Sequence, residues 1–124
     1  MIGYVTVGTN DLARAARFYD AIAAEMGVGR MMEFESFIAW GIPGDPRAGI
    51  AATKPFDGNA ASVGNGMMVA FEAKDRAQVD RLHATALANG GTCEGPPGPR
   101  GEDGFYAGYF RDPDGNKLNA FIMG

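Results

Sequence analysis

An internal repeat constrains the fold of this chain more than any other feature of its sequence. At an offset of 64 residues (75 − 11 = 64), Asp11 aligns with Asp75. The same offset aligns Val5 with Val69, Ala13 with Ala77, Arg17 with Arg81, Ala24 with Ala88, and Gly27 with Gly91. Each half therefore has a strand, an acidic residue that can cap a helix, and a glycine where that helix ends. A strand–helix pair that occurs twice with the same boundaries predicts two copies of one structural unit.

The first half has the pattern of a β-α-β-β-β unit. Apolar side chains recur at helical spacing and predict one amphipathic helix: Leu12, Ala15, Tyr19, Ile22 and Met26. We expect a strand over residues 2–7 before this helix, and strands over 29–35, 36–42 and 48–53 after it.

The second half repeats this order and ends in a hairpin. We expect a strand over 66–72, a helix over 74–89, a short strand over 92–95 and an irregular loop over 96–101. The last two strands are expected over these ranges: residues 104–110 and 117–122. The intervening residues 57–65 are rich in Gly and Asn and lack periodicity, which is typical of a linker.

The fold class that follows is α+β, in one domain over residues 1–124. Two tandem βαβββ modules, about 1–56 and about 66–124, would form a curved mixed sheet around a cavity. One four-stranded module cannot cover both faces of its own sheet, whereas two modules side by side can share a core. We expect the helices on the outer faces.

The turn of the last hairpin carries a family resemblance. The five residues Asp112-Pro113-Asp114-Gly115-Asn116 are all of types that favour tight turns, and Leu118-Asn119 follows one residue later. This stretch resembles the closing hairpin of the glyoxalase/bleomycin-resistance/dioxygenase superfamily, also called vicinal oxygen chelate proteins. The resemblance covers nearly the whole chain and implies the same two-module fold. It also implies a homodimer, which in the bleomycin-resistance branch sequesters a ligand between subunits.

The resemblance also implies metal positions, and this chain fills them with poor ligands. Relatives that use a metal typically place His on the first strand, His or another ligand on the fifth, and Glu on the last. The matching residues here are Tyr4, Met68 and Asn119, and the repeat agrees (68 − 4 = 64). A fourth position, in the strand over 48–53, holds alanine or a neighbour. Neutral phenol, thioether and amide groups do not suit a hard divalent cation, so we expect neither a metal nor another cofactor.

The same positions predict a pocket for a small organic molecule. The candidate ligand-binding residues are Tyr4, Thr6, Trp40, Met68, Tyr109 and Asn119. Aromatic walls, a flexible methionine and a few hydrogen-bonding groups are typical of such pockets. Alternatives stay open: a metal-independent lyase or isomerase that uses Tyr4 and Asn119 as catalytic residues, a metal-dependent lyase or dioxygenase with atypical ligands, or a protein that acts only through protein contacts. The residues do not decide whether the protein is an enzyme.

The net charge indicates which kinds of partner the protein can bind, and the cysteine content indicates in which compartment it works. A formal net charge of −4 argues against nucleic acid or an anionic membrane as partner and suits a neutral or cationic small molecule. The single cysteine, Cys93, excludes an intrachain disulfide and favours a reducing, cytoplasmic location. No apolar run approaches the ~20 residues that span a membrane, and no signal peptide is evident. We expect His83 to be a core or boundary residue and Cys93 a structural thiol. The acids Glu102 and Asp103 would lie in a solvated loop.

Overall fold

The computed structural model describes residues 1–124, and its elements follow the repeat. Their order and bounds are β1 Tyr4–Gly8, α1 Leu12–Glu25, β2 Gly29–Phe34, β3 Phe37–Gly41, β4 Gly49–Thr53, β5 Val69–Glu72, α2 Arg76–Ala88, β6 Thr92–Pro99, β7 Phe105–Arg111 and β8 Lys117–Met123. Each half contains one strand, one helix and three further strands. This confirms the predicted βαβββ order of both modules.

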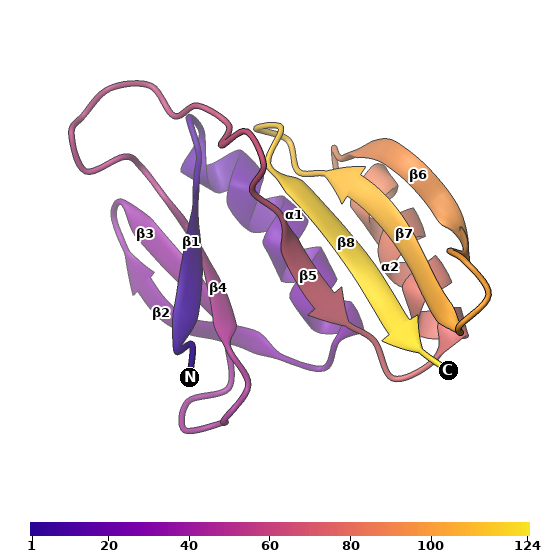
Figure 1. The fold of residues 1–124 in the computed structure, drawn as a ribbon. Coiled ribbons are helices and arrows are strands. Elements are labelled where there is room, and N and C mark those ends of the chain that lie inside the picture. Colours follow the sequence, from indigo (N-terminus) through magenta and orange to yellow (C-terminus); the bar gives the residue numbers. More distant parts are fainter.

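The two modules form two four-stranded mixed sheets of the same topology. The strand orders are β1-β4-β3-β2 and β5-β8-β7-β6, so a shift of four strands converts one into the other. In each sheet the first and last strands of the module pair in parallel, and the other pairs are antiparallel. No backbone ladder joins β1 to β5, so the sheets meet without forming one continuous sheet. In Figure 1 both helices lie on one side of the sheets, and the other side carries no helix.

Equivalent aspartates start the two helices. The Asp11 side chain accepts a hydrogen bond from the backbone N–H of Arg14, and Asp75 accepts one from Gln78. These bonds satisfy backbone donors that the first helical turn leaves free. Gly27 follows the C-cap of α1 with a φ of 76°, which a residue without Cβ adopts at little cost. Neither helix is long and apolar enough to cross a membrane.

One hydrophobic core lies between the helices and the sheets and continues through both modules. Phe18 of α1 is fully buried, and its ring centroid lies 6.4 Å from that of Phe110 on β7. From the second helix, Val79 and Leu82 are fully buried in the same cluster. Burial of each such large side chain contributes about 2 kcal/mol. The modules are thus joined by packing as well as by the linker.

The expected loop after β6 is wrong, because β6 continues to Pro99. Prolines cannot donate to a sheet ladder and are therefore confined to edge strands or bulges. β6 is an edge strand, and its pairing with β7 shifts register on both sides of Gly95. The two irregularities accommodate Pro96 and Pro97 within an extended strand.

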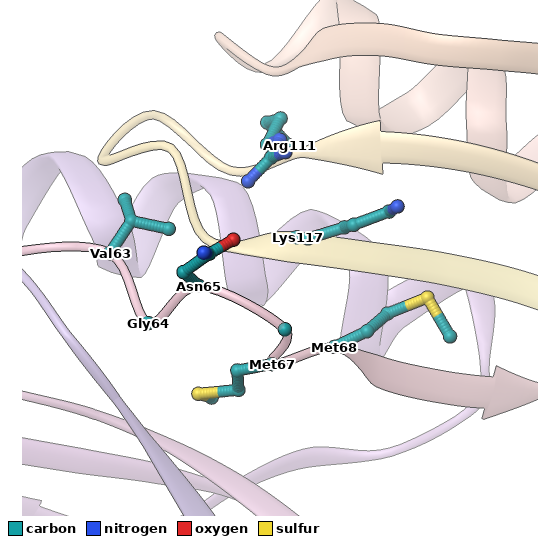
Figure 2. A pocket seen from close by; sticks show the side chains of 8 residues that line it. Val63, Gly64, Asn65, Met67, Met68, Arg111 and Lys117 are labelled. Atoms are coloured by element: carbon teal, nitrogen blue, oxygen red, sulfur yellow. The ribbon is translucent and has the colours of Figure 1, made fainter.

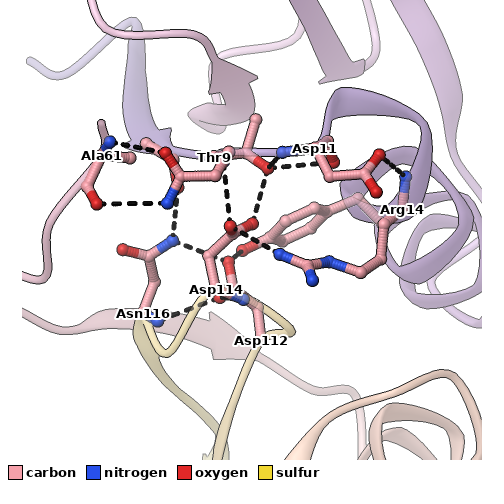
Figure 3. A network of polar contacts seen from close by, with 10 residues as sticks. Thr9, Asp11, Arg14, Ala61, Asp112, Asp114 and Asn116 are labelled. Atoms are coloured by element: carbon pink, nitrogen blue, oxygen red, sulfur yellow. Dashed lines mark hydrogen bonds and ion pairs between the residues drawn. The ribbon is translucent and has the colours of Figure 1, made fainter. Parts of the chain in front are cut away.

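The turn between β7 and β8 fastens the second module to the first (Figure 3). Asp112 is 3% exposed, and its carboxyl group accepts four hydrogen bonds. Three of them come from the turn itself, namely the backbone N–H of Asp114 and both the backbone N–H and the side chain of Asn116. The fourth comes from the Tyr19 hydroxyl of α1 at 2.6 Å. Burial, and next the Asp112 carboxyl, raise the pKa of Tyr19 well above its ordinary value, so this phenol remains a donor.

The neighbouring turn residues reach the end of β1. Asp114 accepts hydrogen bonds from the Thr9 hydroxyl at 2.6 Å and from the Arg14 guanidinium at 2.8 Å. The Asn116 amide donates to the Gly8 carbonyl at 2.9 Å. Next to them, Asn10 holds the linker by two hydrogen bonds to the backbone of Ala61. The turn, the β1–α1 junction and the linker therefore form one polar network.

Removal of the Asp112 carboxyl group should weaken this network strongly. Asp112→Ala leaves the buried Tyr19 hydroxyl without its acceptor, removes one of the two acceptors of the Asn116 amide, and breaks the two backbone bonds of the turn. We therefore expect the free energy of unfolding to fall by about 3–5 kcal/mol. Tyr19→Phe removes one donor only and should cost about 1–2 kcal/mol. The matched control is Asp103→Ala in an exposed loop, expected to change stability by less than about 0.5 kcal/mol. Urea unfolding measures all three, and similar values for Asp112→Ala and the control would contradict the role of Asp112.

Candidate functional site

The second sheet has one face packed on helices and one face open, and strand alternation assigns side chains to each. On β8, Leu118 and Ala120 are fully buried in the core. Asn119 lies between them and therefore points to the opposite, open face. Pairing of β7 with β8 arranges this face in rows, with Arg111 opposite Lys117 and Tyr109 opposite Asn119. A third row places Ala107 opposite Phe121.

Asn119 is the unusual residue of this face. It is 1% exposed, and its side-chain oxygen Oδ1 is buried without any hydrogen-bond partner. Buried amide oxygens are almost always paired, because an unpaired one costs about 1–3 kcal/mol. Asn116, three residues earlier and 5% exposed, satisfies its amide through Gly8 and Asp112. The two buried asparagines of one strand end thus differ in hydrogen bonding: one stabilises the fold and the other has an unused acceptor.

Cations surround the aromatic ring next to Asn119. The Lys117 ammonium lies 5.7 Å from the centroid of the Tyr109 ring, and the Arg100 guanidinium carbon lies 5.5 Å from it. Both distances are within the range of cation–π attraction. Arg111 belongs to the same face and forms an ion pair with Glu94 of β6. The open face of β7 and β8 is therefore cationic at the end nearest the turn.

A hollow of about 500 Å³ adjoins this cationic end. Figure 2 shows it between the linker and the base of the hairpin, with Arg111 directed toward the linker and Lys117 extending in the same direction as Met68. The lining residues are Val63, Gly64, Asn65, Gly66, Met67, Met68, Arg111 and Lys117. Its volume falls within the range of small-molecule sites, about 300–1,000 Å³. The apolar side chains of the lining are Val63 of the linker and Met67 and Met68 just before β5, and the cations come from β7 and β8.

The other predicted residues lie on the first sheet. Tyr4 and Thr6 occupy the open face of β1, where Tyr4 is 54% exposed and meets Phe37 edge to face at 6.3 Å. No hydrogen bond or ring contact connects Tyr4 to Asn119 within one chain. The proposed catalytic pairing of these two side chains therefore has no direct contact to support it in the single chain.

Trp40, a candidate ligand-binding residue in the sequence, faces the core and not the open side of the sheet. Trp40 is 2% exposed, and its ring lies 5.3 Å from that of Tyr19 on α1. Its indole N–H donates to Asp20 of the same helix at 2.8 Å. Ile38 shares this face because residues two apart in a strand point the same way. Trp40 is thus a core residue, whereas Tyr109, another of the candidate ligand-binding residues, lies on the open face opposite Asn119.

The comparisons with known proteins agree with this architecture. The family model of the glyoxalase/bleomycin resistance protein/dioxygenase superfamily matches residues 1–120. The chain belongs to this superfamily. A glyoxalase/bleomycin resistance protein from Albidiferax ferrireducens T118 has a similar crystal structure, with 41% identity, a TM-score of 0.88, and coverage of 98% of this chain and 97% of that one. No curated protein matches the sequence of this chain.

Two less similar structures share the fold of this superfamily member. An enzyme of the glyoxalase/bleomycin resistance protein/dioxygenase family from Burkholderia phytofirmans PsJN has 16% identity and a TM-score of 0.76, with 98% of each chain covered. A lactoylglutathione lyase from Agrobacterium tumefaciens has 21% identity and a TM-score of 0.69, with 98% of this chain and 92% of that one covered. At these identities the likeness shows the fold alone.

The residues at the superfamily's metal positions do not fit a divalent metal. Register identifies the fourth position, since Ala70 pairs with Asn119 in the second module and Thr6 pairs with Ala51 in the first. The set is then Tyr4, Ala51, Met68 and Asn119, which contains no histidine and no carboxylate. The chain also brings together no group of three His, Cys, Asp or Glu side chains that could hold a metal ion. We therefore derive no chemical step through a metal at this site.

Alternation along the last strand predicts Lys117 on the face of Asn119, but neither Lys117 nor Arg111 or Arg100 was predicted to belong to the site. The sequence could have shown that Arg111 and Lys117 are neighbours, because residues paired across this hairpin lie at equal distances from Asp114. Tyr109 and Asn119 both lie five positions from it, and Arg111 and Lys117 both lie three. Arg100 gave no such signal, because its position depends on the unforeseen extension of β6.

A second unpredicted arrangement lies on the helix side of the sheet. His83 Nε2 is 3.3 Å from the sulfur of Cys93, ten residues away. Burial lowers the pKa of His83, while a contact with the Tyr109 backbone acts in the opposite direction. His83 is thus a buried residue of α2, and its ring packs on Phe110 rather than facing the open side.

The two buried asparagines provide a test of which residue serves stability. Asn119→Leu keeps the branching of the side chain and removes an unpaired buried oxygen, so we expect the free energy of unfolding to stay unchanged or rise by about 1 kcal/mol. The matched variant Asn116→Leu should lower it by about 2–3 kcal/mol, because it breaks bonds to Gly8 and Asp112. Urea unfolding measures both values. Equal destabilisation by the two substitutions would show that Asn119 is structural.

Proposed function

We propose that this protein binds a small organic molecule on the open face of its second sheet, without a metal at the superfamily's ligand positions. The ligand would occupy the hollow beside Met68 and lie over Asn119 and Tyr109. The observation that carries the proposal is the buried, unpartnered Oδ1 of Asn119 on a sheet face that no helix covers.

The energetics of Asn119 favour a ligand as its missing partner. A buried polar group without a hydrogen-bond partner lowers stability by about 1–3 kcal/mol unless something compensates. A hydrogen-bond donor on a ligand would supply that compensation. The neighbouring Lys117 and Met68 have long, flexible side chains, which a ligand can displace at low cost to reach the amide.

Native mass spectrometry of the protein isolated gently from its own host tests this function. We expect the mass spectrum to show an organic molecule bound to some or all of the protein. The spectrum of Asn119→Leu should lack this molecule. The control Asn59→Leu lies in the exposed linker and should retain the molecule. A stoichiometric divalent ion instead of an organic molecule would contradict metal-independent binding. No retained molecule in either protein would favour a role through protein contacts alone.

We also propose that two copies of the chain form the working unit. The open face of the first sheet carries apolar side chains that nothing covers, with Tyr4, Met32 and Phe34 being 54%, 43% and 62% exposed. Phe37 links two of them, since its ring contacts those of Tyr4 and Phe34. A contiguous apolar patch of this kind usually marks an interface. A partner chain over this face would bring Tyr4 and Thr6 into a shared cavity.

Light scattering after size-exclusion chromatography tests the dimer. We expect a mass of twice the 13.0 kDa of one chain, and a shift to the monomer mass for Phe34→Glu, because a buried charge at the interface is costly. The matched control is Leu87→Glu, a 40% exposed residue on α2, which should remain dimeric. A monomeric wild-type protein at micromolar concentration would refute the proposal.

A further inference from the structure

We propose that the ligand of this site is a small carboxylate with an apolar, aromatic body. Its anionic group would lie at Lys117 and Arg100, and its body would lie along β8 toward Phe121. This inference rests on the proposed function and specifies the chemical class of the molecule bound.

The charges of the open face are unequally neutralised. Two acids belong to this face. Glu94 forms an ion pair with Arg111, whereas Glu72 of β5 lies opposite Phe121 in the register, at the other end from Lys117, and forms no ion pair. Arg111 first, and Lys117 to a smaller extent, lower the pKa of Glu94, so it remains ionised and balances one cation. Neither Lys117 nor Arg100 forms an ion pair with any carboxylate, and both lie within 6 Å of the Tyr109 ring centroid. Two positive charges therefore remain at one ring, in a chain whose overall charge is −4.

The Arg100 guanidinium is fixed in place before any ligand arrives. It donates to the backbone carbonyls of Pro96 at 2.7 Å, Gly98 at 2.9 Å and Pro99 at 3.4 Å. These bonds use three of its five N–H donors and leave the positive charge uncompensated, because carbonyl groups are neutral. A guanidinium held in this way loses little conformational entropy when it binds an anion.

The opposite end of the same face is aromatic. Phe121 stacks on Phe105 with a centroid distance of 5.8 Å, and the small Ala107 lies opposite Phe121 in the register. Lys117 and Phe121 are four residues apart on β8, a distance of about 13 Å along a strand. The unpartnered oxygen of Asn119 lies midway between them. A matching molecule carries a carboxylate at one end, an aromatic ring at the other and an N–H or O–H donor between.

N-benzoylglycine and its neutral amide, N-benzoylglycinamide, form a suitable pair of probes. Both carry a phenyl ring and an amide N–H, and they differ in the carboxylate. In titrations followed by ¹H–¹⁵N NMR, we expect N-benzoylglycine to bind about tenfold more tightly, since charge-assisted hydrogen bonds are roughly twice as strong as neutral ones. The shifted backbone amides should be those of β7, β8 and the residues around Arg100.

Lys117→Met supplies the decisive variant. It keeps most of the side-chain length and removes the charge, so the preference for N-benzoylglycine should fall to about twofold or less while the neutral amide binds as before. The control Lys74→Met, at an exposed position before α2, should retain the full preference.

Equal affinities for the two probes in the wild-type protein would overturn the inference, and so would an unchanged preference in Lys117→Met. Failure of N-benzoylglycine to bind at millimolar concentration would overturn it as well. None of these results touches the proposed function, which is decided by the molecule that the protein retains from its host. A retained cationic or neutral molecule would uphold binding and contradict the anionic class.

Discussion

The carboxyl group of Asp112 is the point on which the arrangement of the two modules depends. It organises the turn between β7 and β8 through three hydrogen bonds from Asp114 and Asn116, and it accepts a fourth from Tyr19 of the first module. Because all four donors converge on one buried carboxyl group, the turn cannot shift without losing several bonds together. The position of β8 relative to α1 is set in this way. The linker is held by the same network, so the hollow beside Met68 follows from it as well.

The two faces of each sheet have separate roles. Side chains that point to the helices fill one core shared by both modules, and they account for most of the buried apolar surface. Side chains on the open face contribute little to that core and are free to serve binding. Asn116 and Asn119 illustrate the difference, because both are buried but only Asn116 has hydrogen-bond partners. A site that retains an unpaired polar group within a well-packed fold is typical of function rather than stability.

This member of the superfamily keeps the fold but holds other chemical groups at the superfamily's metal positions. Those positions hold phenol, methyl, thioether and amide groups, and the cations near Tyr109 lie outside that set. Lys117 and Arg100 come from two different strand ends, and each lies within 6 Å of the Tyr109 ring centroid. A chain with an overall negative charge can thus present a cationic surface, because the sign of a local field depends on which few side chains converge there.

The sequence by itself determined the local elements, the two-module repeat and the family. These depend on periodicity and capping, such as the aspartates at 11 and 75, which act over a few residues. The face of Asn119 also followed from alternation along β8. Tertiary structure alone decided that Trp40 faces α1, that β6 runs through two prolines, and that Arg100 reaches Tyr109. It also decided that the Asp112 turn binds Tyr19. These outcomes depend on contacts between residues far apart in sequence, whose register and packing no local pattern specifies.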